Sequence, residues 1–310
     1  MVKKYFFGLL LCLVAVISWG GMFPVMAPAL NIMDPFYFTL FRYGSVAIIF
    51  SLILLCVEGP KSFRPEGQSL KLWIFGTSAF AGFSFLVFLG QKVAGPSGAI
   101  IASVMMAVQP LLGVLVNWIY RSIKPTVVSV ISMIIAALGV FMVVTKGNPS
   151  ALLSGNNTLL AVMLILFGAL CWVVYTAGGA DFPKWSILRY STLTTLYGVA
   201  SVIVVLVIAT SLGWLSFPTI RSIGSVSSAL IYMITLAGVI AVFAWNLGNR
   251  LIGPINGILF MNLVPITSFI ISITNGYKVS VFELLGCTIT IAALISNNIY
   301  GRIKSTTTKK

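Results

Sequence analysis

The sequence contains two near copies of one short segment, placed about half a chain apart. Residues 89–96 are LGQKVAGP and residues 247–254 are LGNRLIGP, so the copies lie 158 residues apart in a chain of 310. Each copy joins two long apolar segments, and each half of the chain contains five such segments. If these segments cross a membrane, the odd number per half makes the two halves enter it from opposite sides. We therefore predict two halves related by an inverted repeat.

The composition indicates that lipid is the solvent of this chain. Hydrophobic residues make up 59% and charged residues 8%, with a mean hydropathy of +1.08. Soluble domains need roughly a quarter charged residues, and the length suits ten spans of about 20 residues joined by short loops. Lipid offers no hydrogen-bond partner to an open backbone, so each span must be helical. We predict an all-α membrane protein with ten transmembrane helices in two inverted five-helix repeats, residues 1–146 and 157–303.

The predicted spans are separated by glycine, proline and polar residues, which are typical stop signals. The spans are residues 5–26, 35–56, 71–90, 97–120, 125–145, 158–178, 186–211, 226–248, 255–275 and 281–301.

Further pairs of similar residues occur in the same order in the two halves. They are residues 41–45 (FRYGS) with 188–192 (LRYST), Trp19 with Trp172, Pro110 with Pro265, and residues 136–138 with 292–294 (both AAL). Their offsets vary between 147 and 158 residues, as loop insertions and deletions would produce. The shared order supports a duplication.

The net charge of +14 could indicate a nucleic-acid partner, but the positions of the basic residues favour membrane orientation. With a cytoplasmic N-terminus, 14 of the 19 Lys and Arg residues fall on the inner side, 4 on the outer side, and Arg42 within a span. We therefore expect a multi-pass protein of the bacterial inner (plasma) membrane with both termini cytoplasmic. We expect no nucleic-acid partner.

Several of these residues together resemble the drug/metabolite transporter superfamily, and within it the ten-helix EamA family. The residues are Trp19, Gly20, Gly21, Arg42 after Pro35, Pro110, residues 137–140 (ALGV), Trp172, Tyr175 and Pro265. Family members usually carry a Gly-Glu pair soon after each mid-helix proline, whereas this chain has no glutamate there. The resemblance implies that the first, third, fourth, sixth, eighth and ninth helices surround a cavity, braced by the fifth and tenth. It implies a small-metabolite cargo, most often exported.

Arg42 is the sharpest candidate for substrate binding. It lies about eight residues into its span, or roughly 12 Å below the membrane end of the helix. Leaving it there costs about 2.5–3.5 kcal/mol on insertion scales, so it should face the bundle interior or water. It could attract a carboxylate or phosphate on the substrate, or act as a gate residue. Alternatively, it extends outward or satisfies the carbonyls of a kinked neighbouring helix.

Two amide–proline pairs form a second candidate group. Gln109 precedes Pro110, and Asn262 precedes Pro265 by three residues. A proline within a helix leaves a carbonyl one turn earlier without its partner, and in lipid that carbonyl needs water, a side chain or a ligand. We expect both helices to bend there and two polar notches to face one cavity. The alternative is that the amides only hold helices together.

Aromatic residues form the third group. The candidates for lining the cavity are Trp19, Phe23, Tyr43, Phe83, Trp172, Tyr175 and Trp245. The alternative for most of them is a place in the interfacial belts, where Trp and Tyr gather in membrane proteins. Trp19 and Trp172 are the strongest candidates, since repeat-related residues should face each other. Gly20 and Gly21, with Pro110 and Pro265, are expected to act as hinges.

Catalytic chemistry is not indicated by this sequence. It has no histidine, four isolated cysteines and five acidic residues, all predicted in loops or at helix ends. We expect no metal, no cofactor and no enzymatic activity. The preferred function is a secondary transporter that moves an amino acid or related amphipathic metabolite by alternating access. The alternatives are an uptake or exchange carrier for a charged cofactor or nucleotide-like compound and, more distantly, an intramembrane lipid-modifying enzyme. Expected partners are the small-molecule substrate and membrane lipid, and a homodimer is left open.

Overall fold

The structure is a computed structural model that describes residues 2–122, 124–148, 157–252 and 257–307. Gly253 and Pro254, which end the second near copy, lie outside these residues, as do Lys309 and Lys310 at the C-terminus.

The described chain forms helices in the following order. The α-helices are α1 (Val2–Ala29), α2 (Pro35–Glu58), α3 (Ser69–Gly76), α4 (Phe83–Val93), α5 (Gly98–Ala107), α6 (Gln109–Arg121), α7 (Val127–Thr145), α8 (Thr158–Gly178), α9 (Ile187–Ser211), α10 (Ile220–Ser225), α11 (Ser227–Ile234), α12 (Ala241–Ile252), α14 (Leu263–Thr274) and α15 (Val281–Thr307). Short 3₁₀ turns occur at η1 (Pro60–Phe63), η3 (Gly95–Ser97), η5 (Gly179–Asp181) and η7 (Ile258–Asn262). Two π-helical segments, η2 (Thr77–Gly82) and η6 (Thr235–Ile240), continue α3 into α4 and α11 into α12.

Seven helices in the described residues are long and apolar enough to cross a membrane, and an eighth is added if one bent pair counts as one span. That pair is α5 with α6, bent by 47° at Val108. Two further apolar stretches, Phe260–Thr274 and Val281–Asn297, are shorter. The chain is a multi-pass membrane protein, and its division into ten spans stays a prediction.

Side-chain caps occur at several helix starts. Asp34 accepts a hydrogen bond from the Phe36 amide at 2.8 Å, with Pro35 in the first turn of α2. Thr126, Ser186 and Thr219 cap α7, α9 and α10 in the same way. These side-chain oxygens satisfy amide groups that a helix start leaves without partners.

The surface of the bundle is rich in large apolar side chains, whereas several polar groups are buried in its mainly apolar interior. Ile48, Leu138 and Val204 are each more than half exposed, whereas Arg42 and Gln91 are buried. Apolar side chains on the outside are stable only if lipid surrounds them.

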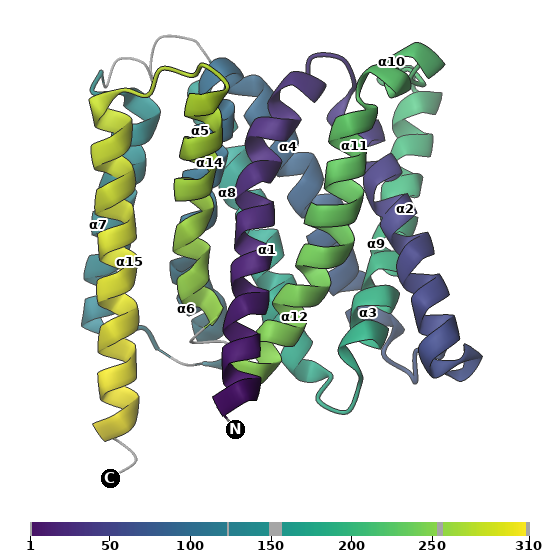
Figure 1. The fold of residues 1–310 in the computed structure, drawn as a ribbon, viewed down its shortest axis with the longest axis horizontal. Coiled ribbons are helices and arrows are strands. Elements are labelled where there is room, and N and C mark those ends of the chain that lie inside the picture. Colours follow the sequence, from purple (N-terminus) through teal and green to yellow (C-terminus); the bar gives the residue numbers. More distant parts are fainter. Residues whose placement is uncertain (1, 123, 149–156, 253–256, 308–310) are drawn as a thin grey trace.

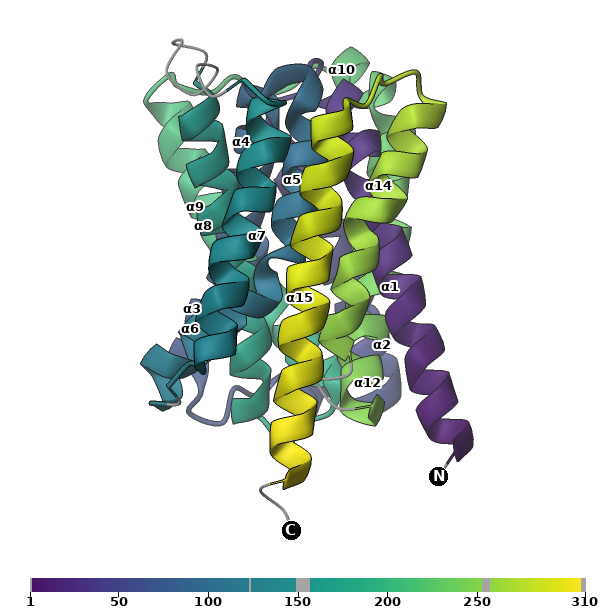
Figure 2. The ribbon, with the colours of Figure 1, turned by 90° about the vertical axis from the view of Figure 1, so that its left-hand side faces the viewer.

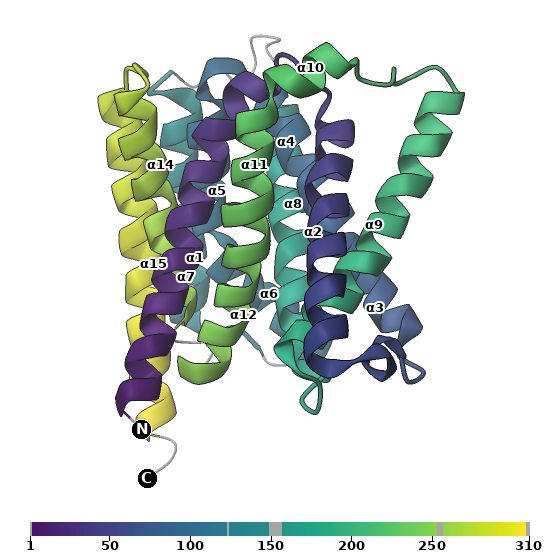
Figure 3. The same cartoon turned by 45° about the vertical axis from the view of Figure 1, so that its right-hand side comes forward.

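The helices run roughly parallel to one direction, and the start of α1 and the end of α15 lie at the same end of the bundle (Figures 1 and 2). We call this the terminal end and the opposite one the far end. The helices α7 and α15 pack against each other at one edge, α4 packs against α8, and α1 packs against α12 and α14. Figure 3 shows α2 and α9 on the side away from α15.

Small residues bring the paired helices close together. A Cβ atom at Gly168 of α8 would lie 3.1 Å from the Val87 amide of α4, and one at Gly286 of α15 would lie 2.9 Å from a Val143 methyl of α7. Close backbone approach through small residues is the usual way in which membrane helices associate.

Candidate functional site

A small cavity lies among α1, α2, α4, α8 and the two interrupted helices α5–α6 and η7–α14. Its volume is about 20 Å³, which is enough for one water molecule. The lining residues are Trp19, Met22, Phe23, Arg42, Tyr43, Phe83, Met106, Gln109, Trp172, Met261 and Val264. Both halves of the chain therefore contribute to one central, mostly apolar space.

Indole rings form the core of this cavity. The Trp19 ring is 5.4 Å from Trp172 in an edge-to-face arrangement and 5.3 Å from Trp245. Trp172 is in turn 5.3 Å from Phe83 and 5.2 Å from Tyr175. Aromatic pairs at these distances gain about 0.5–1.5 kcal/mol beyond area burial. The predicted contact of Trp19 with Trp172 is present in this structure.

Arg42 is fully buried beside these rings. Its Nη2 atom donates to the Ala237 carbonyl at 3.3 Å, and its guanidinium lies 4.4 Å from the Tyr43 ring centroid and 5.8 Å from that of Phe88. The Trp19 Nε1 atom donates to the same Ala237 carbonyl at 3.1 Å. Ala237 belongs to η6, where π-helical geometry interrupts the regular α-helical ladder. One irregular turn therefore positions two predicted site residues from different helices.

Several buried polar atoms at this site have no hydrogen-bond partner within the described part of the chain. They are Nε and Nη1 of Arg42 and Nε1 of Trp245, and Oδ1 of Asn262, which follows the lining residue Met261 in the chain. The Gln109 Nε2 atom donates only to the Met106 thioether, at 3.1 Å, and sulfur is a weak acceptor. Unsatisfied buried polar atoms cost free energy, and they are expected where a ligand supplies the missing partner.

A larger hollow of about 190 Å³ continues from the cavity toward the terminal end. It shares Gln109, Trp172 and Met261 with the cavity and extends to Asn117 and Ala180. Another hollow, of about 320 Å³, lies at the far end between the end of α1 and the turn after α4. This far-end hollow shares no lining residue with the cavity.

A contact between α1 and α4 separates the cavity from the far-end hollow. The Gln91 Nε2 atom donates to the Phe23 carbonyl at 2.7 Å. Phe23 lines the cavity and Gln91 lines the hollow, and both residues are buried. In this conformation the cavity is thus closed toward the far end and adjoins the terminal-end hollow.

The structure brings most of the predicted site residues together. Trp19, Arg42, Tyr43, Gln109 and Trp172 line the cavity. Trp245 lines the terminal-end hollow. Tyr175 lies behind Trp172, where its hydroxyl accepts from Asn246 at 3.3 Å. Asn262 is buried at the end of η7 but lines neither space.

The predicted hinge residues differ in their surroundings. Pro110 lies in the first turn of α6, directly after the bend, and Pro265 follows the 3₁₀ turn η7 near the start of α14. Gly20 and Gly21 lie within the continuous helix α1 and pack closely against Thr267 and Tyr232. Their visible role is close packing, and their role as hinges stays a prediction.

Sequence reasoning missed three parts of this site. The methionines Met22, Met106 and Met261 line the cavity, and the Ala237 carbonyl holds Arg42 and Trp19. The Gln91–Phe23 contact was also missed. The position of Gln91 in the duplicated segment was the only available signal, since π-helical turns have no sequence signature here.

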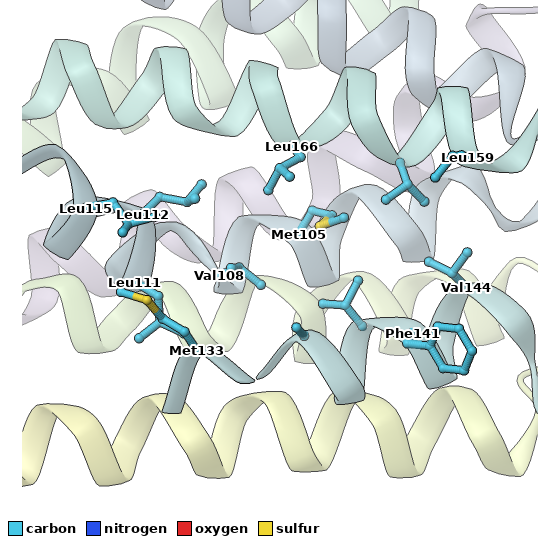
Figure 4. Close-up of a pocket in the computed structure, with 13 residues that line it drawn as sticks. Met105, Val108, Leu111, Leu112, Leu115, Met133, Phe141, Val144, Leu159 and Leu166 are labelled. Atoms are coloured by element: carbon cyan, nitrogen blue, oxygen red, sulfur yellow. The ribbon is translucent and has the colours of Figure 1, made fainter. Parts of the chain in front are cut away.

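A separate groove of about 390 Å³ lies between α5, α6, α7 and α8 (Figure 4). Its lining is apolar throughout, including Met105, Val108 and Leu166. Figure 4 shows these side chains pointing into a shared space beside the bend at Val108. Such a surface is suited to lipid tails rather than to a polar ligand.

Comparison with known proteins decides the family. Residues 6–145 match the EamA-like transporter family. The chain is 46% identical over 299 residues to "Uncharacterized transporter YrdR" of Bacillus subtilis (strain 168). The matched region covers 96% of this chain and 93% of the relative. The chain belongs to the EamA family of transporters. The family resemblance seen in the sequence is thereby confirmed, and this EamA-family protein is a membrane transporter.

Two further matches extend over nearly the whole EamA-family chain. "Uncharacterized transporter YyaM" of Bacillus subtilis (strain 168) is 28% identical over 297 residues, covering 94% of this chain and 93% of the relative. A solved crystal structure superposes with a TM-score of 0.65 at 17% sequence identity, covering 95% of this chain and 98% of its own. The latter similarity concerns the fold alone.

Proposed function

We propose that this protein is a secondary transporter that moves a small amphipathic metabolite across the bacterial plasma membrane by alternating access. The cargo is an amino acid or a related compound, and the direction is export. The protein has ten spans in two inverted halves, residues 1–146 and 157–303, with both termini in the cytoplasm. The observation that carries this proposal is the single cavity to which both halves contribute, with a hollow at either end.

Matching helix contacts in the two halves support the inverted repeat. A Cβ atom at Gly90 of α4 would lie 2.8 Å from the Ala161 carbonyl oxygen of α8. A Cβ atom at Gly248 of α12 would lie 3.1 Å from the Gly8 carbonyl oxygen of α1. Gly90 and Gly248 are 158 residues apart, the offset of the duplicated segment, and Gly8 and Ala161 are 153 apart, the offset of Trp19 and Trp172. The contact between α4 and α8 thus has a repeat-related counterpart between α12 and α1.

The two π-helical segments support the same relationship. They are η2 and η6, which cover Thr77–Gly82 and Thr235–Ile240 and are also 158 residues apart. A bend precedes Pro110 in one half, and an irregular turn precedes Pro265 in the other. Interrupted helices at the midplane of both repeats are typical of secondary transporters.

The amides of the duplicated segment are suited to act as alternating gates. Gln91 reaches from α4 to the Phe23 carbonyl of α1, which closes the far end. Its counterpart Asn249 donates instead within its own helix, to the Trp245 carbonyl at 2.8 Å. By the repeat offsets, the counterpart of Phe23 is Thr176, which lines the open terminal-end hollow. In the opposite state, Asn249 would bond to the Thr176 carbonyl while Gln91 releases Phe23.

Substrate gradients are the simplest driving force for this protein. Of the acidic residues, Glu66 and Asp181 pair with Arg189 and Lys71 at the terminal end. Glu283 is buried, but it lies in the first turn of α15 and pairs with Lys146 at the far end. None of the cavity-lining residues is acidic, whereas pumps that bind protons at mid-membrane usually carry an ionisable group there.

Flux measurements in liposomes test the proposal. Purified protein is reconstituted and radiolabelled metabolites are screened for flux, with and without a pH gradient. We expect saturable flux of the wild-type protein without a pH gradient. Trp172→Ala should abolish this flux. Trp214→Ala should retain it, because Trp214 is an exposed tryptophan outside the cavity. Normal flux in Trp172→Ala would show that the cavity does not hold the cargo.

The Nε and Nη1 atoms of Arg42, which have no hydrogen-bond partner among the described residues, favour a second candidate function, an exchange carrier for a charged compound. Such a carrier predicts counterflow: unlabelled cargo on one side should accelerate entry of labelled cargo from the other. A net exporter shows flux into liposomes that contain no internal substrate, and an obligate exchanger does not.

A further inference from the structure

Arg42 carries a buried charge without a counter-ion among the described residues. The ion pairs in this part of the chain involve Lys71, Lys146 and Arg189, and none includes Arg42. Arg42 is 1% exposed, and its contacts are one carbonyl and two aromatic rings. An unpaired buried charge is expensive, so its retention at the cavity calls for a partner of opposite charge.

The cavity itself offers no such partner, because its lining consists of apolar and uncharged polar residues around Arg42. The ion-paired carboxylates of Glu66, Asp181 and Glu283 lie at the two ends of the bundle. The positive charge at the centre is therefore left for something that enters from outside the chain.

We propose that the cargo is a small monocarboxylate whose carboxylate binds Arg42 and whose apolar part packs on the cavity wall. This inference rests on the proposed transport function and names its substrate class. The free Nε and Nη1 atoms supply charge-assisted hydrogen bonds, which are about twice as strong as neutral ones. Gln109 can supply a further N–H group, since it now donates only to the Met106 sulfur.

The charge count favours a carboxylate over a phosphate. One guanidinium neutralises one negative charge, and among the described residues that line the cavity Arg42 is the only basic one. A phosphate monoester carries a charge of about −1.5 to −2 at neutral pH, so part of it would stay buried and unpaired. A free amine finds no carboxylate among the described lining residues, and its charge would add to that of Arg42. Within the proposed range of amino acids and related amphipathic compounds, the inference therefore selects those without a free amine.

The remaining wall selects an apolar body for the carboxylate. Trp19, Trp172, Met106 and Met261 surround the space next to Arg42. Indole faces offer large rigid contact areas, and methionine side chains adapt to different shapes. This wall fits branched or aromatic carboxylates, once the cavity widens from its present volume.

Binding of matched compounds to purified protein tests the inference. The probes are 3-methylbutanoate and 3-phenylpropanoate, their amine counterparts 3-methylbutylamine and 3-phenylpropylamine, and phenyl phosphate. We expect thermal stabilisation by at least one carboxylate and by neither amine. Arg42→Gln keeps an N–H donor for the Ala237 carbonyl but removes the charge, so carboxylate affinity should fall about tenfold or more.

Control variants separate charge recognition from folding. Arg221→Gln removes an exposed arginine on α10 and should bind as wild type does. Arg42→Lys keeps the charge and should retain part of the affinity. Equal affinity of wild type and Arg42→Gln, binding of the amines alone, or stabilisation by neither carboxylate would overturn the inference. Preferential binding of phenyl phosphate would also overturn it and favour the exchange carrier.

Flux distinguishes failure of this inference from failure of the proposed function. If liposomes move neutral or cationic cargo and Arg42→Gln is unimpaired, the transporter proposal stands and the carboxylate assignment is wrong. If carboxylates bind but no compound is moved, the binding site stands and the transport mechanism is wrong.

Discussion

At the scale of single residues, the site depends on one backbone carbonyl. The carbonyl of Ala237 accepts hydrogen bonds from Trp19 of α1 and Arg42 of α2. Both donors belong to the first half of the chain, whereas the acceptor lies in the second half. This shared acceptor fixes the position of an indole and a guanidinium at the same point in the cavity wall.

Replacing Trp19 by Phe should separate the hydrogen bond from the ring. The variant keeps an aromatic ring near Trp172 but leaves the Ala237 carbonyl with Arg42 alone. We expect the free energy of unfolding to fall by about 0.5–1.5 kcal/mol, measured by denaturation in detergent. Trp245→Phe is the matched control, because the Trp245 Nε1 atom has no partner among the described residues and its loss should be neutral.

The ion pair of Glu66 with Arg189 should make the terminal end sensitive to acid. The hydrogen bond from Arg189, 2.7 Å long, lowers the pKa of the Glu66 carboxyl below its ordinary value of 4.5. A lowered pKa in the folded state means that the stabilisation is present above the ordinary pKa and is lost as the pH falls through the lowered one. Because Glu66 is exposed, we expect a small effect.

Thermal unfolding of wild type and Glu66→Gln as a function of pH measures that effect. The difference between the two proteins should be constant near neutral pH and shrink as the solution becomes acidic. A difference that stays unchanged at acidic pH would show that the ion pair does not contribute to stability.

At the scale of elements, glycines allow paired helices to pack with their backbones in close contact. A larger side chain at such a glycine should push the two helices apart. Gly286 of α15 faces Met142 and Val143 of α7, and this pair lies at the edge of the bundle away from the cavity. Gly286→Val should lower the free energy of unfolding by about 1–3 kcal/mol through overpacking. Gly224→Val is the control, since no atom lies within 4 Å of a Cβ at that position. Equal stability of the two variants would contradict this packing.

The amide gates can also be tested at this scale. Loss of the hydrogen bond in Gln91→Ala should open the far end, so a cysteine introduced at Met22 in the cavity should react faster with an impermeant thiol reagent from that side. Asn249→Ala should not raise this rate, because Asn249 closes the terminal end in the proposed opposite state, and in this structure its amide donates within its own helix. Faster labelling in Asn249→Ala than in Gln91→Ala would contradict the assignment of the gates.

At the scale of the whole molecule, the proposed orientation places the terminal end in the cytoplasm. Lys184 is exposed next to α9 at the terminal end, and Lys278 is exposed between α14 and α15 at the far end. The experiment uses a Cys56→Ser background, which removes the exposed native thiol. In intact cells, Lys278→Cys should react with a membrane-impermeant thiol reagent, and Lys184→Cys should not. Labelling of both cysteines, or of Lys184→Cys alone, would overturn the topology.

The sequence alone determined the helices and most of the candidate site. Lipid allows an apolar segment hardly any backbone geometry besides the helix, so segment positions followed from composition. Residues such as Arg42 and Trp172 stood out because polar and aromatic groups deep in apolar spans need a reason to be there. The expected cavity contacts of Gln109 were found, and those of Asn262 were not.

Only the tertiary structure decided which atoms meet. The bonds of Trp19 and Arg42 to Ala237, and of Gln91 to Phe23, join residues 68 to 218 positions apart. They depend on the rotation of each helix about its axis and, for the Ala237 carbonyl, on the irregular turn η6. A shift of one residue along a helix turns the side chain by roughly 100° around the helix axis, so no local pattern specifies such contacts. The close packing of small residues between helices sets them.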